Sequence, residues 1–515
     1  MNIKDFKDVL NGSLESRYQT MKSTRDMVLA RAQKMSMYTI PSLFPSDVNT
    51  SDEMKLHTTY QSSTARYVNT LAGSLLLTLF PPQGRFFALD PDDVNIKDIQ
   101  EIRKKLFKEE DAVHSYFRNQ MANSSLYEAL RQLIIGGNTC LYTEDDGSTS
   151  VIPLWQYTVS RDCRGNIIMA VIEETMSVRM LDQETRDLLT TDVFTGDKKT
   201  LETDSVKLYT GIERVNKDKV KIWQEINDIV VTEETIVLER ESPYIFPVLI
   251  LLPNASYGRA FAEDYYGDAY TVEEFSRVLN KIITISSMTV GLCRNSKLAR
   301  DLADSKKDIP FETGESDDLA FISPNKTQDM RALLEHITNT KRELGMSYAD
   351  KISIQRSGER VTAEEIKRLA LALENALGGI YSKLSATLQL PMIHTVFRIM
   401  RKKGLVTGIT TVLDKAGVSL KIVGGYEVLG KGHNAERLMT FGSFIANNPK
   451  WNQRLKDGTF LDALSRAMQL DEGDLLKSDE DIQQEMQAAQ ANEVAGNLAP
   501  VIAKEAMQDG NTERQ

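Results

Sequence analysis

Cysteine, histidine and tryptophan are scarce in this sequence of 515 residues, which has three cysteines, five histidines and three tryptophans. Cys140, Cys163 and Cys293 lie far apart and lack the CxxC spacing of a structural zinc site, and three cysteines are too few for a disulfide framework. A reducing compartment such as the bacterial cytoplasm fits this usage. No histidine has a second histidine or a cysteine at ligand spacing, so we expect no metal site.

Long apolar runs are also missing. The longest, Val248–Leu252, is far shorter than the ~20 residues of a membrane-spanning helix, and residues 1–10 are polar where a secretion signal would have an apolar core. We therefore expect a chain that is neither inserted in a membrane nor secreted.

The sequence is short of positive charge. Its net charge of −11 argues against a general nucleic-acid coat, which needs a basic face. Residues 471–515 hold 11 acidic and 3 basic residues, hence a charge of −8, so most of the imbalance lies there. The rest of the chain is close to neutral, which leaves room for a local basic ring.

Signatures of catalysis and of cofactor binding are absent too. HExxH and GxSxG do not occur, and Ser256-Tyr257-Gly258-Arg259 lacks the spacing of a nucleophile elbow. Gly425–Gly432 nearly matches a phosphate-binding loop, but Gly432 stands where the loop needs a magnesium-binding hydroxyl. We interpret this segment as a glycine turn before a helix, and we expect no catalytic residue and no cofactor.

What the sequence does contain is an ordered series of helical and extended segments, long enough for two or more structural units. Helical spacing from Tyr60 to Leu75 is stopped by Pro81-Pro82, and amphipathic stretches follow at about 98–117 and 124–135. Residues 139–252 alternate β-branched runs with turns, which predicts a mainly β region with a helical insertion near 178–189. The pattern is that of an α+β fold.

Two long helices are predicted to flank a short polar module. Thr271 and Glu274 form a capping-box pattern, which predicts a helix from there to about Arg294. Residues 297–325 are polar, with seven acids and four bases. Ser323-Pro324 then predicts the start of the second helix.

A loop over residues 351–361 and a bent helix come next. Thr362 and Glu365 form a second capping-box pattern, and Gly378-Gly379 predicts a bend in the helix that follows. Pro391 restarts a helix that ends near Gly404, and a short β segment is expected at 418–423.

Several of these stretches resemble the portal, or head-to-tail connector, proteins of short-tailed bacteriophages. The similarity includes Tyr38–Pro45, Leu75–Pro81, Ser256–Arg259 with Tyr266–Asp268, and Leu377–Ser382. Arg356–Ile366 is the most specific match, and Gly425–Gly432 also looks like an element of this family. The resemblance covers roughly residues 15–470.

The resemblance implies a portal fold with long stem helices, a mixed α/β wing, a small clip, a helical crown and a C-terminal helical barrel. It assigns these ranges: wing 1–270, first stem helix 271–294, clip 295–325, second stem helix 326–350, channel loop 351–361, long bent wing and crown helix 362–403, crown 404–470, and acidic barrel or flexible tail 471–515.

It also implies a non-enzymatic homo-dodecamer at one vertex of the capsid. DNA would pass through its channel during packaging and ejection, beside a loop with Lys351, Arg356 and Arg360. The clip, with Glu315, Asp317 and Asp318, would dock the terminase motor and later the tail adaptor and tail tube.

Further partners implied by the resemblance are the major capsid, scaffolding and internal core proteins. The expected location is the portal vertex of the virion, and the host bacterial cytoplasm during assembly. The alternative interpretation is another structural or tail component of the virion without catalytic activity.

Overall fold

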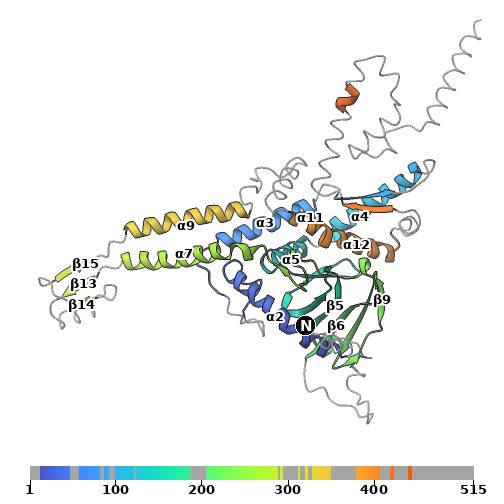
Figure 1. Ribbon diagram of the computed structural model, residues 1–515, viewed down its shortest axis with the longest axis horizontal. Coiled ribbons are helices and arrows are strands. Elements are labelled where there is room, and N and C mark those ends of the chain that lie inside the picture. Colours follow the sequence, from blue (N-terminus) through green and yellow to red (C-terminus); the bar gives the residue numbers. More distant parts are fainter. Residues whose placement is uncertain are drawn as a thin grey trace, which may run out of the picture. The chain divides into compact units, whose positions relative to one another are not determined.

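The computed structural model describes residues 12–46, 57–81, 86–91, 99–120, 123–181, 183, 185–186, 205–287, 290–293, 311–313, 319–322, 327–348, 379–405, 418–422 and 439–443. The chain divides into two compact units, one formed by Met1–Ile99 and Lys105–Tyr426 and the other by Gln100–Lys104 and Glu427–Gln515. Of the second unit, the description covers the first turns of one helix and the short helical segment 439–443. The mixture of helices and antiparallel sheet confirms the α+β class (Figure 1).

Helices make up the N-terminal part of the first unit, as the sequence predicts. Their bounds are α2 Leu14–Met37, α3 Ser63–Leu79, α4 Ile99–Gln120 and α5 Asn123–Gly136. α3 ends just before Pro81, which cannot continue a helix. α5 ends where Gly137 takes a φ of 71°, a left-handed conformation that favours glycine.

The largest sheet is an antiparallel meander in the order β4-β5-β6-β7-β8, with β9 paired to β7 beside β8. The bounds are β4 Tyr157–Arg161, β5 Ile167–Ser177, β6 Ser205–Arg214, β7 Lys219–Ile226, β8 Ile229–Val230 and β9 Thr235–Leu238. Asn227 and Asp228 join β7 to β8 with φ of 49° and 64°, as the tight hairpin turns require.

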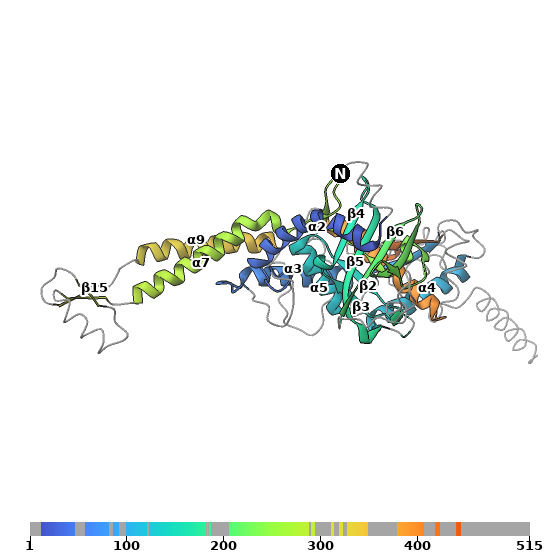
Figure 2. The ribbon, with the colours of Figure 1, turned by 90° about the horizontal axis from the view of Figure 1, so that it is seen from below.

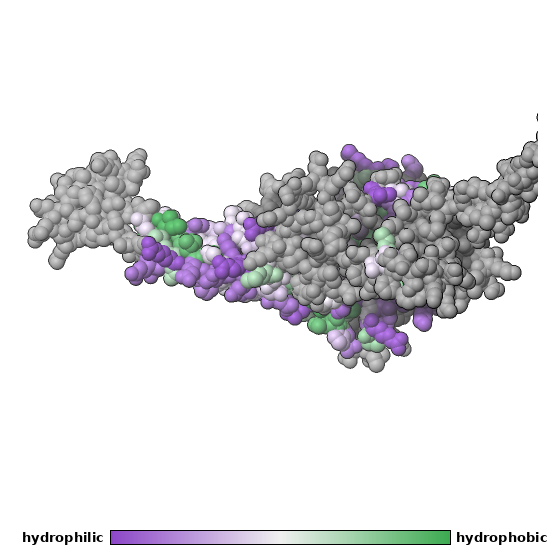
Figure 3. Space-filling model, turned by 90° about the horizontal axis from the view of Figure 1, so that it is seen from above, coloured by the Kyte–Doolittle hydropathy of each residue, from purple (hydrophilic) through white to green (hydrophobic). Residues whose placement is uncertain are grey.

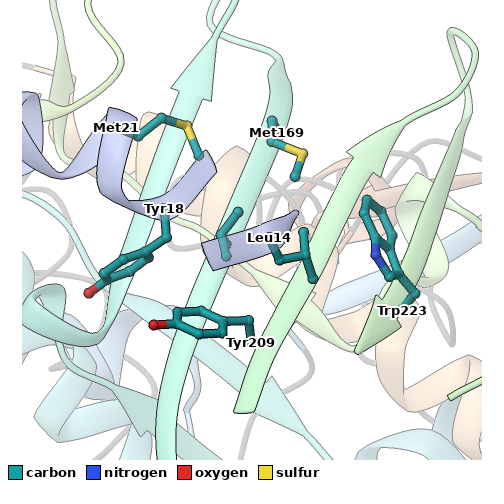
Figure 4. Packing of buried hydrophobic residues seen from close by; sticks show 7 residues of the cluster. Leu14, Tyr18, Met21, Met169, Tyr209 and Trp223 are labelled. Atoms are coloured by element: carbon teal, nitrogen blue, oxygen red, sulfur yellow. The ribbon is translucent and has the colours of Figure 1, made fainter. Parts of the chain in front are cut away.

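Helix α2 covers one face of this sheet (Figure 4). The buried cluster consists of Leu14, Tyr18 and Met21 from the helix and Met169, Val171, Tyr209 and Trp223 from the strands. Glu225 caps the helix, because its carboxylate accepts from the Leu14 N–H at 2.7 Å and from the Trp223 indole at 2.8 Å. The start of α2 is thus fixed over β6 and β7.

Smaller sheets and single turns complete the β region. The strands are β2 Cys140–Thr143, β3 Thr149–Ile152, β10 Tyr244–Ile245, β11 Ile250–Leu251 and β12 Gly258–Arg259. The 3-10 turns are η1 Leu154–Gln156, η2 Val178–Met180, η3 Glu239–Glu241 and η4 Ala262–Tyr265. The helical insertion expected at 178–189 thus begins with one 3-10 turn, followed by helical residues at 183 and 185–186; residues 187–189 lie outside the described part.

Two long helices, α7 Tyr266–Ser287 and α9 Thr327–Ser347, lie side by side in both ribbon views (Figures 1 and 2). The predicted start of the first helix at Thr271 is wrong. α7 begins five residues earlier, so Thr271 lies inside it and its hydroxyl donates to the Gly267 carbonyl at 2.8 Å rather than capping the helix. The predicted end near Arg294 is also wrong, since α7 ends at Ser287 and residues 290–293 form a strand.

The helix expected over 362–403 is described from Gly379 onward. Gly379 has a φ of 85° and stands directly before α11, while the helix expected on its other side lies outside the described residues, so the predicted bend stays a prediction. α11 Ile380–Leu384, a π-helical turn at Ser385–Gln389 and α12 Leu390–Lys402 follow, and α12 ends before Gly404 as predicted. The π turn places the buried Gln389 amide against the Leu79 carbonyl, where it caps the end of α3.

A two-stranded sheet joins the early and late parts of the first unit. β1 Phe87–Pro91 pairs with β16 Val418–Ile422, which confirms the short β segment expected there. From α4, the Glu110 carboxylate accepts from the Leu89 N–H at 2.7 Å, and His114 Nε2 lies 3.4 Å from the Phe87 carbonyl. These two side chains occupy the edge of β1 that faces away from β16.

Candidate functional site: the stem, the clip and their junction with the wing

Helices α7 and α9 form an antiparallel pair through a narrow apolar seam. The Phe275 ring meets the His336 ring edge-on at 5.2 Å, and Ile337 and Leu344 are buried on the same side of α9. The seam leaves other apolar side chains of the pair exposed to solvent. Ile283 is 50% exposed and Leu334 is 55% exposed, and Ile285 and Met346 are about half exposed as well.

The end of α9 is anchored in the body of the unit by aromatic contacts. Tyr348 is buried against Phe261 at 5.2 Å and Tyr265 at 5.5 Å, and this burial raises the pKa of its phenol. From α3, the Tyr67 hydroxyl donates to the Lys341 carbonyl at 3.0 Å. Gly345 lets the Tyr67 ring approach, since a Cβ there would lie 3.3 Å from it.

The start of α7 is held by the turn that follows α2. Tyr38 packs edge-on against Tyr266 at 5.7 Å and against Tyr270 at 5.5 Å. The buried Glu273 carboxylate accepts from the Tyr60 N–H at 2.7 Å. The portal-like segment at Tyr38–Pro45 therefore acts as a support for the stem.

The portal-like segment Ser256–Arg259 joins the wing sheets to the stem. The Tyr257 hydroxyl accepts from the Val159 N–H of β4 at 2.9 Å. The Asn138 side chain brackets Gly258, accepting from its N–H at 2.7 Å and donating to its carbonyl at 2.9 Å. Arg259 pairs with Glu263 at 3.1 Å in the turn that leads into α7. These contacts join the segment to β4, to the end of α5 and to the turn before α7.

A largely buried guanidinium stabilises the same junction. Arg161 donates from Nε to the Ser256 carbonyl at 3.1 Å, from Nη1 to the Gly165 carbonyl at 2.9 Å, and from Nη2 to the Phe246 carbonyl at 2.8 Å. Burial lowers the pKa of this guanidinium. Its three contacts fix three separate backbone segments relative to one another.

Between α7 and α9 lies a three-stranded sheet, and two of its strands fall within the range 295–325 that was predicted as the clip. β13 Val290–Cys293 is the central strand, parallel to β14 Phe311–Thr313 and antiparallel to β15 Leu319–Ile322. Both strand edges of this small sheet are therefore formed by segments that follow β13 in the sequence. A small sheet between two helices agrees with the order helix, polar module, helix that the sequence patterns predict.

The charged residues proposed from the sequence lie outside the described residues. This holds for Lys351, Arg356 and Arg360 of the expected channel loop and for Glu315, Asp317 and Asp318 of the expected clip surface. The second capping-box pattern at Thr362 and the glycine segment 425–432 also lie outside them. These residues therefore remain candidates on the evidence of the sequence.

Where the chain is described, no group of three or more histidine, cysteine, aspartate or glutamate side chains could hold a metal ion. Of the described helices, none has both the length and the hydropathy needed to cross a bilayer. Cys140 is a buried thiol and Cys163 an exposed one.

Sequence patterns gave little indication of the junction residues Asn138 and Arg161. Asn138 follows Gly136-Gly137, and this cluster of turn-forming residues is the sequence signal that could have indicated its role. Arg161 sits in a β-rich run where an arginine is ordinarily solvated, so its burial depends on contacts far away in the sequence.

The chain is similar to known connector proteins along most of its length. A family model described as bacteriophage head to tail connecting protein matches residues 11–472. The portal protein of Escherichia phage T7 is 29% identical over 442 residues, covering 82% of this chain and 80% of the T7 protein. The portal protein of Enterobacteria phage SP6 is 26% identical over 513 residues, covering 96% of each chain.

Among solved structures, a chain in the virion of a native gene transfer agent particle is similar at 9% identity with a TM-score of 0.31, over 75% of this chain and 92% of that chain. The family model spans far more than half of the sequence, so the chain belongs to the bacteriophage head to tail connecting proteins. Its relatives are the portal proteins of short-tailed phages, which confirms the resemblance drawn from the sequence motifs. It is a component of the phage virion at the connection between head and tail.

Proposed function

We propose that the chain assembles into a closed ring, a dodecamer, at one vertex of the capsid, and that DNA passes through its channel during packaging and ejection. The observation that carries this proposal is the exposed apolar surface of the α7–α9 pair. Ile283, Ile285, Leu334 and Met346 are each about half exposed on helices whose shared seam is already filled. Apolar surface lies among hydrophilic surface along this pair (Figure 3). Such surface is typical of an interface between subunits.

A ring follows when each subunit offers two different faces to its two neighbours. A pair of helices has two sides besides the face that meets the body, so the stem is suited to contact a copy on either side. Because the contact is head-to-tail, closure by rotation gives a ring with a central channel.

In this proposal the loop 351–361 faces the channel. Lys351, Arg356 and Arg360 against Glu359 give 3 − 1 = +2 per chain, or about +24 in a dodecamer. Each contact to DNA phosphate adds affinity and salt dependence, so a shallow basic belt would retain DNA without stopping its movement. Salt screens charges beyond ~10 Å, so only groups near the duplex contribute.

The clip module between β13 and β15 is proposed to dock the terminase motor and later the tail adaptor and tail tube through Glu315, Asp317 and Asp318. The major capsid, scaffolding and internal core proteins are the proposed partners of the rest of the ring. The subunit itself is proposed to be non-enzymatic, with ATP hydrolysed by the terminase.

Native mass spectrometry of the purified chain tests the assembly. At micromolar protein and moderate salt, without nucleic acid or ATP, we expect a ring, with a central channel visible by negative-stain microscopy. Monomers alone under these conditions would contradict the proposal. The channel role is tested by Lys351→Ala, Arg356→Ala and Arg360→Ala combined, which should leave the ring intact and lower the DNA content of filled capsids.

A further inference from the structure

Side chains occupy two exposed strand edges of the first unit. On β1, the Glu110 carboxylate and the His114 imidazole meet the Leu89 N–H and the Phe87 carbonyl. On β4, the Tyr257 and Ser256 hydroxyls accept from the Val159 and Arg161 N–H groups at 2.9 and 3.4 Å. An edge sealed in this way cannot pair with the strand of another chain.

The opposite edge of the large sheet is formed by β8 and β9, and the register shows which of its backbone groups point outward. In an antiparallel pair, facing residues alternate between bonded and non-bonded. The Glu239 N–H donates to the Asp218 carbonyl at 2.9 Å, which makes that pair a bonded one. Counting back along the register, Val237 and Thr235 bond to β7, whereas both backbone groups of Ile236 and the N–H of Leu238 point away from the sheet.

The same count applies to β8. The Val231 N–H donates to the Gln224 carbonyl at 2.9 Å, so Ile229 bonds to β7 and the backbone of Val230 points outward. Within the described residues, no strand pairs with the outward groups of Val230 and Ile236 or with the Leu238 N–H, whereas the Leu238 carbonyl begins the η3 turn.

Apolar side chains lie along this open edge. Val230 is 51% exposed and Ile236 is 57% exposed, although β-branched residues normally pack against a neighbour in a sheet. Glu233, in the bulge between β8 and β9, is exposed, and the neighbouring Glu234 meets Lys221 at 3.0 Å. The edge therefore offers backbone hydrogen bonds, apolar side chains and a negative charge along β8, β9 and the residues between them.

We propose that the β8–β9 edge binds an extended segment of a different protein of the assembled particle by strand addition. The segment would have β-branched side chains at alternate positions and a lysine or arginine facing Glu233. Main-chain bonds would supply affinity and the alternate side chains specificity. The inference rests on the proposed assembly of the chain into a virion ring.

The β4 and β9 edges of a second copy do not fit this edge. The β4 edge that a head-to-tail contact would bring to β9 is sealed by Ser256 and Tyr257. Pairing of β9 with β9 uses the same surface on both partners, so it produces twofold pairs and cannot extend around a ring. The proposal therefore commits to a different chain, whose basic residue would face Glu233, and a copy as the occupant is one outcome of the test below.

Hydrogen exchange at single-residue resolution tests the proposal on the isolated ring and on the same ring in assembled heads. The inward amides of Val237 and Thr235 should be protected in both samples and serve as internal controls. The outward amides of Ile236 and Leu238 should exchange rapidly in the ring and slow by about tenfold or more in heads. Equal rates in the two samples would overturn the proposal, and so would protection already present in the isolated ring, which would indicate a copy as the occupant.

A proline variant separates strand addition from general burial. Ile236→Pro removes an outward donor and leaves the ladder to β7 intact, a position where edge strands tolerate proline. Native mass spectrometry should show normal rings, while incorporation of the ring into heads should fall at least about tenfold. Val237→Pro, which breaks the inner ladder, should instead lower the stability of the wing. Normal incorporation of Ile236→Pro rings would refute the inference, whereas failure of the wild-type chain to form rings would refute the proposed function.

Discussion

Two regions of the subunit differ in whether their side chains find partners within one chain. One is the junction that leads from the sheets into α7, and the other is the stem, the α7–α9 pair. At the junction, Asn138 brackets Gly258 and Arg161 reaches three carbonyl groups within the subunit, although the buried Glu273 Oε2 has no hydrogen-bond partner among the described residues. On the stem, the apolar side chains of Ile283 and Leu334 remain half exposed. In the proposed ring, the junction would determine whether the subunit folds and the α7–α9 pair whether subunits assemble.

This division has a physical basis. An unpaired polar group in the interior costs free energy whatever the surroundings offer later, so the junction must be satisfied during folding. Exposed apolar surface leaves no polar group unpaired in the folded subunit, and its burial against a partner contributes ~25 cal/mol per Å². Substitutions at the junction should therefore lower the free energy of unfolding. Substitutions on the stem should instead prevent assembly and leave that free energy almost unchanged.

The largest effect on folding is expected for Gly137→Ala. Gly137 has a φ of 71°, and a Cβ there would lie 2.5 Å from the backbone of Arg259. Strain of this kind and the clash should together lower the free energy of unfolding by about 4 kcal/mol, measured by chemical denaturation. Gly267→Ala is the matched control: a Cβ there meets nothing within 4 Å, so helix propensity should make this change neutral or stabilising. Equal stability of the two variants would contradict the role assigned to the junction.

Removal of the Arg161 guanidinium should have the next largest effect. Arg161→Met keeps most of the side-chain volume but leaves the carbonyls of Gly165, Phe246 and Ser256 without this donor. At about 1 kcal/mol for each lost bond, the free energy of unfolding should fall by about 3 kcal/mol. Arg164→Met, on the exposed turn of the same hairpin, should change it by less than ~0.5 kcal/mol. If both variants unfold at the same denaturant concentration, the three contacts of Arg161 do not stabilise the junction.

Sequence patterns predicted local elements well where periodicity and a stop signal coincide. The helix before Pro81, the helix after Pro391 and the strand at 418–422 are confirmed. The start of α7 was placed wrongly because Thr271 and Glu274 have capping spacing inside a helix that begins at Tyr266. A local pattern cannot reveal that the preceding residues are already helical.

The candidate site was predictable only in part, for a related reason. The order helix, polar module, helix follows from the sequence, but the exposure of Ile283 depends on which face of α7 meets α9. The roles of Asn138 and Arg161 depend on partners about 90 to 120 residues away in sequence. Motif similarity located Ser256–Arg259 correctly, while only the structure shows that its residues join sheets to stem.

Alkaline pH should weaken the Tyr348 anchor at the end of α9, with a smaller effect on stability than the Gly137 and Arg161 substitutions. Burial raises the pKa of Tyr348, so the folded chain keeps the phenolic proton to a higher pH than the unfolded chain, whose tyrosines titrate near ~10. The stabilisation is complete below that pH and is lost above it, at up to about 1.4 kcal/mol per pH unit for one group. Melting temperatures recorded from pH 8 to 11 should fall above pH 10, and less steeply for Tyr348→Phe. Identical slopes for the two chains would show that Tyr348 does not contribute.

The smallest effect on folding, with the greatest effect on assembly, is expected for Ile283→Glu combined with Leu334→Glu. Both positions are exposed on helices, and glutamate is a good helix former, so the free energy of unfolding of the subunit should change by less than ~0.5 kcal/mol. In a ring, however, the new carboxylates would be buried against the neighbouring subunit without partners, at a cost of several kcal/mol each. Native mass spectrometry should therefore show monomers in place of rings, with an unchanged circular dichroism spectrum. Asn339→Glu places the same charge on an exposed polar position of α9 and should still form rings. Rings formed normally by the double variant would mean that the exposed apolar residues of the stem do not lie between subunits.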